Sequence, residues 1–521
     1  MNVIIQKLKY NYRIFLGILL TILICTAVFC YYGNEKEIIF CDEVYTYTIV
    51  NHGIGLTVRD NRWYVDGEMD YRLNSSSGYF GYEEAIRITG EDVHPPIYYL
   101  IFKTFSMMFP HSTSKWIGFL AGYVVLVPML ALIYWGIWKI SKKVWLATLL
   151  TVLFGVHPGI QGCALLIRMY FLLAFWFIVF YMQTQELSEK AEQKWWMYAA
   201  LGITTFLGFM TQYYFAVYVI FFSVIFGIDF LLQKKWKQLL AYLGTMIAAV
   251  AASTVFFPKW IDHIFYGYKG QEAFDTLNNW NNYAEEIKET FRSVGNFVFP
   301  NYSYIYWILL VTIMICFFAI RNPALKNIKK HCMMHFVAQI MYYCIVAHVM
   351  PSVEARYFWS VVIVQMVMLI WMLAIILEHC KVTETKLAAT ALTIFTIIYT
   401  ALVPTRIYDV PYIGVTYKEG RLIMEENAHI PWVYYGERNW KMHCSAFDML
   451  IPDYLMYIRD LSTLAYDDIL QSSQQIVVYA QSEGEAEDFV EKLEEVSGFE
   501  CQYELLTVRP YNYVYLVTFQ Y

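Results

Sequence analysis

The sequence predicts a polytopic α-helical membrane protein of about eleven transmembrane helices, followed by a small α/β domain. Three observations support this prediction. Of the 521 residues, 58% are hydrophobic and 16% are charged, and the mean hydropathy is +0.41, whereas a soluble protein is about half apolar and a quarter charged. Apolar runs long enough to cross a bilayer recur along residues 1–404. After residue 405 the charge density rises and the apolar runs shorten.

The first expected span covers residues 14–32, and Lys7, Lys9 and Arg13 precede it. Because this run lacks a small-residue cleavage site, we interpret it as a retained span and not as a signal peptide. Further apolar runs of spanning length are found at 116–138, 144–160, 163–182, 195–211, 213–232, 238–257, 303–320, 333–350, 357–378 and 386–404.

The orientation follows from the positive-inside rule. Residues 94–109 are apolar but barely long enough to cross, and we expect a half-inserted or surface helix there. All short basic connections then fall on the side of the N-terminus: 139–143, 183–194, 233–237, 321–330 and 378–386. This places the chain in the cell membrane with a cytoplasmic N-terminus. The long loops 33–115 and 258–302, and the region after 405, are predicted to lie outside the cytoplasm.

The C-terminal region 405–521 is expected to form a soluble, extracytoplasmic α/β domain beside the transmembrane domain 1–404. Its pattern indicates a helix between buried strands. Strands are expected at 431–435, 475–480, 501–508 and 511–519, and an amphipathic helix at 483–496. Cys444 and Cys501 lie in this region, and the sequence does not decide whether they pair.

Charge and motifs exclude several classes of function. The net charge is −6 with no basic excess, which argues against a nucleic-acid partner. The ten cysteines form no CxxC or Cys/His metal pattern. No convincing phosphate-loop, dinucleotide-binding, nucleophile-elbow or zinc-protease motif occurs. No cofactor is therefore predicted, and a divalent metal is not indicated, although the sequence leaves that question open.

Asp42 and Glu43 form an acidic pair a few residues after the first span. A carboxylate at a membrane boundary is expensive to desolvate, and one that faces the protein interior is a functional candidate. Half-removed from water, it can act as a general base. The competing interpretation is that the pair caps the helix expected at 44–50, whose N-terminus favours negative charge.

His94 begins a His-Pro-Pro-Ile-Tyr-Tyr stretch that includes Tyr98. Two prolines start a helix rigidly, so the plain interpretation is the start of an interfacial helix. His94 also stands two residues from Asp92 and can serve as a hydrogen-bond donor or metal ligand.

Arg168 and Arg356 are expected at the outer ends of two spans, and Glu354 lies two residues before Arg356. Such an arginine either extends to the interface, pairs with a carboxylate or binds an anion. An acid, two arginines and a histidine on one membrane face suit chemistry on a phosphate ester. Weaker candidates occur in the second outer loop, namely Asp262, His263 and Glu272.

Together these motifs resemble the GT-C membrane glycosyltransferases. The order is Asp-Glu after the first span, His-Pro-Pro-x-Tyr-Tyr, Pro…Arg-x-Tyr, and Glu-x-Arg-Tyr before a late span. The likeness is to glycosyltransferase family 39 and the RgtA/B/C/D-like group, which are relatives of protein O-mannosyltransferases and aminoarabinose transferases. It covers about residues 1–404. The chain departs from the family at Phe358-Trp359-Ser360, where a proline-rich continuation is usual.

The resemblance implies a glycosyltransferase that takes a sugar from a polyprenyl-phosphate donor outside the membrane. It implies that Asp42 is the acceptor base with Glu43 as its support, and that Arg168 and Arg356 bind the donor phosphate. His94, Tyr98 and Glu354 would contact substrate. The expected partners are the lipid-linked donor, membrane lipids and an acceptor of unknown kind, either a cell-wall polymer, a protein or a lipid.

Two other functions fit part of the pattern. A transporter or flippase of lipid-linked sugars would use the same arginines to hold a headgroup, but inverted repeats and charges at mid-membrane are typical of that class, and neither is evident. A non-catalytic scaffold that displays residues 405–521 leaves Asp42, Arg168 and Arg356 unexplained as a set.

Overall fold

The computed structural model describes residues 2–65, 67–75, 81–190, 192–350 and 354–520. Contacts divide the chain into two compact units. The first comprises Met1–Tyr31, Thr89–Tyr98 and Gly122–Val410, and the second comprises Tyr32–Ile88, Tyr99–Ala121 and Pro411–Tyr521. The second unit thus joins part of the predicted first loop to the C-terminal region, a grouping that composition alone does not indicate.

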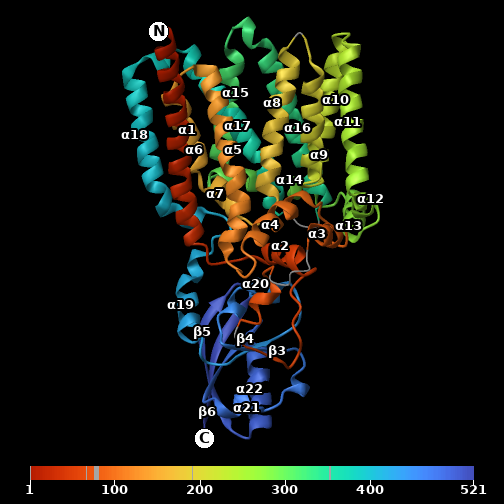
Figure 1. Ribbon diagram of the computed structural model, residues 1–521, viewed down its shortest axis with the longest axis vertical. Helices are drawn as coiled ribbons and strands as arrows, with labels where there is room; N and C mark the ends of the chain where they lie inside the picture. Colours follow the sequence, from red (N-terminus) through yellow and green to blue (C-terminus); the bar gives the residue numbers. More distant parts are fainter. Residues whose placement is uncertain (1, 66, 76–80, 191, 351–353, 521) are drawn as a thin grey trace. The chain divides into compact units, whose positions relative to one another are not determined.

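The first unit is helical (Figure 1). Its long helices come from the apolar runs of the sequence, and shorter helices connect them. The helices are α1 (Asn2–Asn34), α5 (Lys115–Ser141, whose first residues belong to the second unit), α6 (Val144–Gly155), α7 (Pro158–Leu165), α8 (Tyr170–Glu189), α9 (Trp195–Phe209), α10 (Tyr214–Leu232), α11 (Trp236–Phe256), α12 (Lys259–Phe265), α13 (Tyr268–Leu277), α14 (Tyr283–Val298), α15 (Ser303–Ala319), α16 (Lys326–Val349), α17 (Arg356–His379) and α18 (Lys386–Leu402).

Within the described residues, seven helices are long and apolar enough to cross a membrane, or up to nine if each of two bent pairs is one span. A polytopic helical protein is therefore confirmed, but with fewer spans than the eleven predicted. Helix α9 has only 15 residues, about 22 Å of helix. Helix α8 ends in polar turns that contain Gln183, Gln185 and Glu186. The bent pairs are α6 with α7 at 61° and α14 with α15 at 83°.

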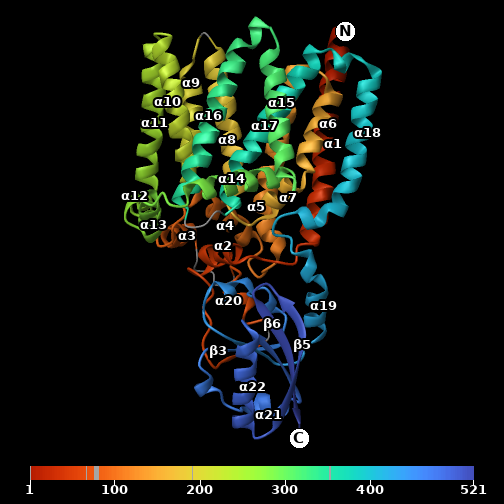
Figure 2. The same cartoon turned by 180° about the vertical axis from the view of Figure 1, so that it is seen from behind.

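Helices α8 and α17 are neighbours in the first unit, as both views show (Figures 1 and 2). In the most apolar stretch of α17, 72% of the residues are buried by other parts of the protein.

Helices α5 and α7 approach each other closely at Gly122. A Cβ atom on Gly122 would lie 1.9 Å from the carbonyl oxygen of Ala164. Only glycine therefore allows α5 to approach the end of α7 so closely.

The second unit is built around a six-stranded mixed sheet. Its helices are α2 (Cys41–Asn51), α3 (Tyr82–Thr89), α4 (Ile97–Met108), α19 (Lys418–Glu426), α20 (Trp440–Cys444), α21 (Asp468–Ser472) and α22 (Glu483–Ser497), of which α3 and α4 extend into residues of the first unit. Its strands are β1 (Trp63–Val65), β2 (Trp432–Tyr435), β3 (Tyr454–Ile458), β4 (Gln475–Ala480), β5 (Glu500–Arg509) and β6 (Asn512–Gln520). Short 3₁₀ helices in the chain occupy Asp70–Arg72, Pro323–Leu325, Val382–Glu384, Val403–Asp409, Val415–Tyr417, Asp448–Leu450 and Leu461–Thr463.

The strand order is β1-β3-β2-β4-β6-β5. Strand β2 is parallel to β3 and to β4, whereas the β1–β3, β4–β6 and β5–β6 pairs are antiparallel. The antiparallel pairing of Tyr64 with Leu455 makes residues from the predicted first loop part of the C-terminal sheet. This pairing of distant segments gives the second unit its cohesion.

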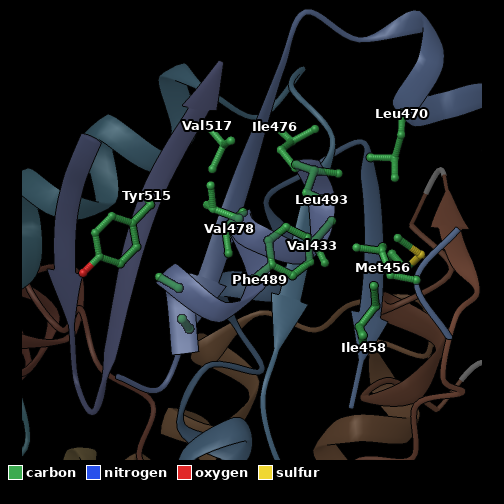
Figure 3. Packing of buried hydrophobic residues seen from close by; sticks show 14 of the residues in the cluster. Val433, Met456, Ile458, Leu470, Ile476, Val478, Phe489, Leu493, Tyr515 and Val517 are labelled. Atoms are coloured by element: carbon green, nitrogen blue, oxygen red, sulfur yellow. The ribbon is translucent and has the colours of Figure 1, made fainter. Parts of the chain in front are cut away.

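Helix α22 closes one face of the sheet (Figure 3). Its Phe489 and Leu493 are fully buried against Val433, Ile476 and Val478. The Ser482 hydroxyl accepts a hydrogen bond from the Glu485 amide, a typical N-cap, and Gly498 ends the helix with φ of 75°. The predicted helix and four predicted strands are confirmed within a residue or two at their ends, and β1 and β3 were not predicted.

Candidate functional site

Residues 89–98 of the first unit lead into helix α4 and carry the His-Pro-Pro motif. Pro95 and Pro96 remove two backbone donors before the helix, and the Ile97 amide donates to the carbonyl oxygen of Met210 at 3.0 Å. These contacts fix the backbone beside Asp92 and His94. The segment can therefore present both side chains in a defined direction.

Asp92, His94 and Arg168 form a hydrogen-bonded chain. The His94 Nδ1 atom lies 2.7 Å from Asp92 Oδ2, and the Arg168 Nη2 atom lies 3.0 Å from His94 Nε2. Arg168 is 4% exposed, and it precedes α8 in the irregular link after α7. The structure thus brings together two predicted site residues, His94 and Arg168, that are 74 positions apart in the sequence.

The electrostatics of this chain favour an ionised Asp92. Burial raises the pKa of the Asp92 carboxyl, but the hydrogen bond to the His94 imidazole and the charge of Arg168 are among the interactions that outweigh burial, so the pKa is lowered overall. A carboxylate held this way stays ionised and accepts a hydrogen bond from His94 Nδ1. Asp92 is thus set to orient the imidazole.

His263 joins the same region from helix α12. Its Nε2 atom lies 3.2 Å from the carbonyl oxygen of Gly90, and the Tyr213 hydroxyl lies 2.8 Å from its Nδ1 atom. Burial lowers the pKa of His263, more than its hydrogen bond to Gly90 and the charge of Asp92 raise it. The weaker sequence candidate His263 therefore supports the segment that carries Asp92 and His94.

Arg356 lies at the start of α17, close to the start of α8. Its Nη1 atom is 3.1 Å from Glu354 Oε2, and the Arg356 side chain is 11% exposed. The next residue, Tyr357, packs edge-on against Tyr170 with ring centres 5.8 Å apart. The Ser360 hydroxyl also donates to the Tyr170 carbonyl oxygen at 2.6 Å. The start of α8, which follows Arg168, and the start of α17, which carries Arg356, are thus packed together.

Helix α13 adds Lys269 and Glu272, which form an ion pair at 2.8 Å. Burial lowers the pKa of Lys269, but the hydrogen bond and charge of Glu272 raise it by more. Burial also raises the pKa of the neighbouring Tyr268, with smaller contributions from the charges of Asp92 and Glu272. The Tyr268 phenol of α13 therefore lies within electrostatic range of Asp92. Sequence reasoning missed Lys269, because a lysine in a charged loop has no distinguishing signal.

In the second unit, Glu43 is completely buried in an ion pair with Lys36. The Lys36 Nζ atom lies 2.7 Å from Glu43 Oε1, and the Phe40 amide donates to Glu43 Oε2 at 2.7 Å. Burial lowers the pKa of Lys36, although the adjacent Glu43 carboxylate opposes the shift. Both oxygens of Glu43 are therefore engaged at the N-terminus of α2. The capping interpretation weighed from the sequence explains Glu43.

Asp42 precedes Glu43 on the first turn of α2 and is partly exposed. The Cys41 thiol lies 3.9 Å from its Oδ1 atom, and the Thr46 hydroxyl donates to its carbonyl oxygen at 3.2 Å. The Asp42 side chain is thus less buried than that of Glu43. Of the acidic pair, Asp42 is the side chain with the access that a general base needs.

The remaining predicted residues occupy varied surroundings. Tyr98 on α4 is 3% exposed and belongs to the packed interior. Cys444 and Cys501 are free thiols. Among the described residues, no group of three or more His, Cys, Asp or Glu side chains is arranged to hold a metal ion. Lys36, the buried partner of Glu43, was not singled out from the sequence. The signal that it offered was a lysine seven residues before a glutamate at an expected helix start.

Comparison with known proteins gives similarity in three dimensions only. No protein-family model matches the sequence, and no curated protein matches it. The fold is similar to ArnT from Cupriavidus metallidurans bound to undecaprenyl phosphate, with a TM-score of 0.48 and 10% identity over 96% of this chain and 97% of that chain. The apo state of the same protein gives 0.49 and 9% over the same shares. The archaeal oligosaccharyltransferase AglB from Archaeoglobus fulgidus gives 0.41 and 11% over 90% of this chain and 69% of that chain.

Proposed function

We propose that the protein is a membrane glycosyltransferase that uses a polyprenyl-phosphate-linked sugar as donor. The observation that carries the proposal is the pair of buried arginines at the packed starts of α8 and α17. Arg168 is oriented by His94, and Arg356 is oriented by Glu354. Two buried guanidinium groups held by neighbouring side chains suit a lipid-attached phosphate better than a role as interfacial anchors.

The chemistry requires a base for the acceptor and positive charge for the departing phosphate. In the proposed step, the acceptor oxygen forms a bond to the anomeric carbon of the sugar as its proton passes to the Asp42 carboxylate. The bond between the anomeric carbon and the phosphate oxygen breaks, and its electron pair stays on the polyprenyl phosphate. Arg168 and Arg356 stabilise the negative charge that develops there. Glu43 acts indirectly, because its ion pair with Lys36 fixes the helix that carries Asp42.

Substitution of the two arginines tests this proposal. Membranes containing the wild-type protein, Arg168→Gln or Arg356→Gln would be supplied with a radiolabelled polyprenyl-phosphate sugar and an envelope extract as the acceptor. We expect kcat/KM to fall by about 10²–10³ in each variant, since each loses a charge that stabilises the transition state. Arg292→Gln on α14 is the matched control, because the Arg292 side chain is 66% exposed.

Two outcomes would contradict the proposal. One is undiminished transfer by Arg168→Gln and Arg356→Gln when both variants are correctly folded. The other is movement of the intact donor across the membrane with no new glycosidic product, which is the result that a transporter gives. Mass analysis of the labelled product distinguishes transfer from transport, because only transfer separates the sugar from the lipid phosphate.

A further inference from the structure

The proton positions in the Asp92–His94–Arg168 chain follow from its geometry. Arginine carries only hydrogen-bond donors, so at 3.0 Å the Arg168 Nη2 group must donate to His94 Nε2. That nitrogen is therefore unprotonated. The imidazole proton must lie on Nδ1, which donates to the Asp92 carboxylate at 2.7 Å. His94 is thus neutral, in the single tautomer that the two neighbours permit.

This arrangement restricts the Arg168 side chain. A free arginine side chain loses rotamer entropy when it binds a ligand. Here the guanidinium is buried and hydrogen-bonded to a ring that Asp92 holds in turn. Part of the ordering cost is therefore met before any ligand arrives, which favours affinity for an anion.

A second proton on His94 would reverse the interaction. The Nε2–H group would face the N–H group of Arg168, and two positive charges would lie about 3 Å apart, a repulsive arrangement. Other charged or titratable groups face the chain from their own elements. They are His263 on α12, Tyr268 on α13 and Tyr213 before α10. Of these, His263 is the other histidine, and burial lowers its pKa.

We propose that Asp92 and His94 are positioning residues, which hold the Arg168 guanidinium for the donor phosphate only while His94 is neutral. The inference rests on the proposed function, because it takes Arg168 as the ligand of a lipid-linked phosphate. It predicts that donor affinity falls in acid and that the acceptor KM does not. His94 touches neither reacting atom in this scheme and acts through Arg168.

The test measures the donor KM and the binding of a polyprenyl-phosphate sugar to the full-length protein in nanodiscs between pH 5 and 8. The donor is a phosphodiester, so it lacks the ionisation near pH 6 of a phosphate monoester. His94→Gln is the key variant, since its amide can accept from Arg168 and cannot take up a proton. In Asp92→Asn the amide can donate to His94 Nδ1. This favours the tautomer with its proton on Nε2, and Arg168 cannot donate to that nitrogen. His263→Gln controls for the second histidine.

We expect the wild-type donor KM and Kd to rise about tenfold from pH 7.5 to pH 5. In His94→Gln the donor KM and Kd should stay constant between pH 8 and pH 5. Asp92→Asn should bind about tenfold more weakly at pH 8, roughly the loss of one charge-assisted hydrogen bond. His263→Gln should keep the wild-type pH dependence.

An acid loss of affinity that persists in His94→Gln would overturn the inference, as would wild-type binding by Asp92→Asn or no binding of the donor by any form. Failure of the proposed function would be visible separately. In that case the wild type would bind the lipid-linked sugar with the predicted pH dependence but would form no glycosidic product. Size-exclusion chromatography of each variant establishes that it is folded before binding is compared.

Discussion

Replacing Glu43 with glutamine should destabilise the second unit without removing a group from the reaction. The substitution keeps the shape of the side chain and leaves the Lys36 ammonium buried without its counter-charge. Breaking a buried ion pair by removing one partner costs about 3–5 kcal/mol. For a folding unit of 150–250 residues, that corresponds to a fall in unfolding temperature of roughly 6–20 °C.

The stability of Glu43→Gln should depend on pH in a direction that the pKa of Lys36 determines. In Glu43→Gln, burial still lowers the pKa of Lys36, and the carboxylate that opposed the shift is gone. The unfolded chain then binds more protons than the folded one above neutral pH, so the stability of the variant rises with pH. The deficit relative to the wild type should therefore shrink from pH 7 to pH 10.

Intrinsic tryptophan fluorescence on heating, in one detergent at each pH, measures the effect. The double variant Lys36→Met/Glu43→Gln is the matched control, since removing both charges of a buried pair is often nearly neutral. It should recover most of the lost unfolding temperature. An unchanged unfolding temperature together with lost transfer in Glu43→Gln would refute this reasoning, because it would make Glu43 a member of the catalytic machinery.

Further expectations concern acid stability and orientation. His443 accepts a hydrogen bond from the Leu56 amide at 2.9 Å, and burial lowers its pKa. The unfolded state then takes up the proton first, so the unfolding temperature should fall as pH drops below about 6.5, and less so in His443→Asn. For orientation, cysteines replacing Ile140 and Glu419 should label from opposite sides, with Glu419 outside, in a background without the exposed Cys30, Cys316 and Cys380. Labelling of both positions from one side would contradict the predicted topology.

Periodicity predicted the elements that alternate clearly between apolar and polar residues. Helix α22 and strands β4, β5 and β6 were expected from this signal. Strand β3 is a short apolar run, which cannot be distinguished from buried helix by pattern alone. Strand β1 has three residues and exists because it pairs with β3. Its partner is hundreds of positions away, so local sequence could not indicate it.

The sequence indicated which residues belong to the candidate site, but not which of them are in contact. His94, Arg168, Arg356 and Glu354 were each recognised as polar groups near predicted membrane boundaries. The bond between His94 and Arg168 depends on how the link before α8 meets the segment before α4, which is a tertiary outcome. The burial of Glu43 by Lys36 is also a tertiary outcome, although the capping alternative was visible at a helix start.

The most direct test of the central claim is the transfer of sugar from a radiolabelled polyprenyl-phosphate donor by wild type and Asp42→Asn in the same membranes. Asparagine keeps the size of the side chain and cannot accept the acceptor proton. The account predicts product formation by the wild type and a rate lower by about 10²–10⁴ in the variant, with the donor Kd and the unfolding temperature unchanged. Undiminished transfer by a folded Asp42→Asn variant would contradict the assignment of Asp42 as the base, and no transfer by the wild type would contradict the proposed function itself.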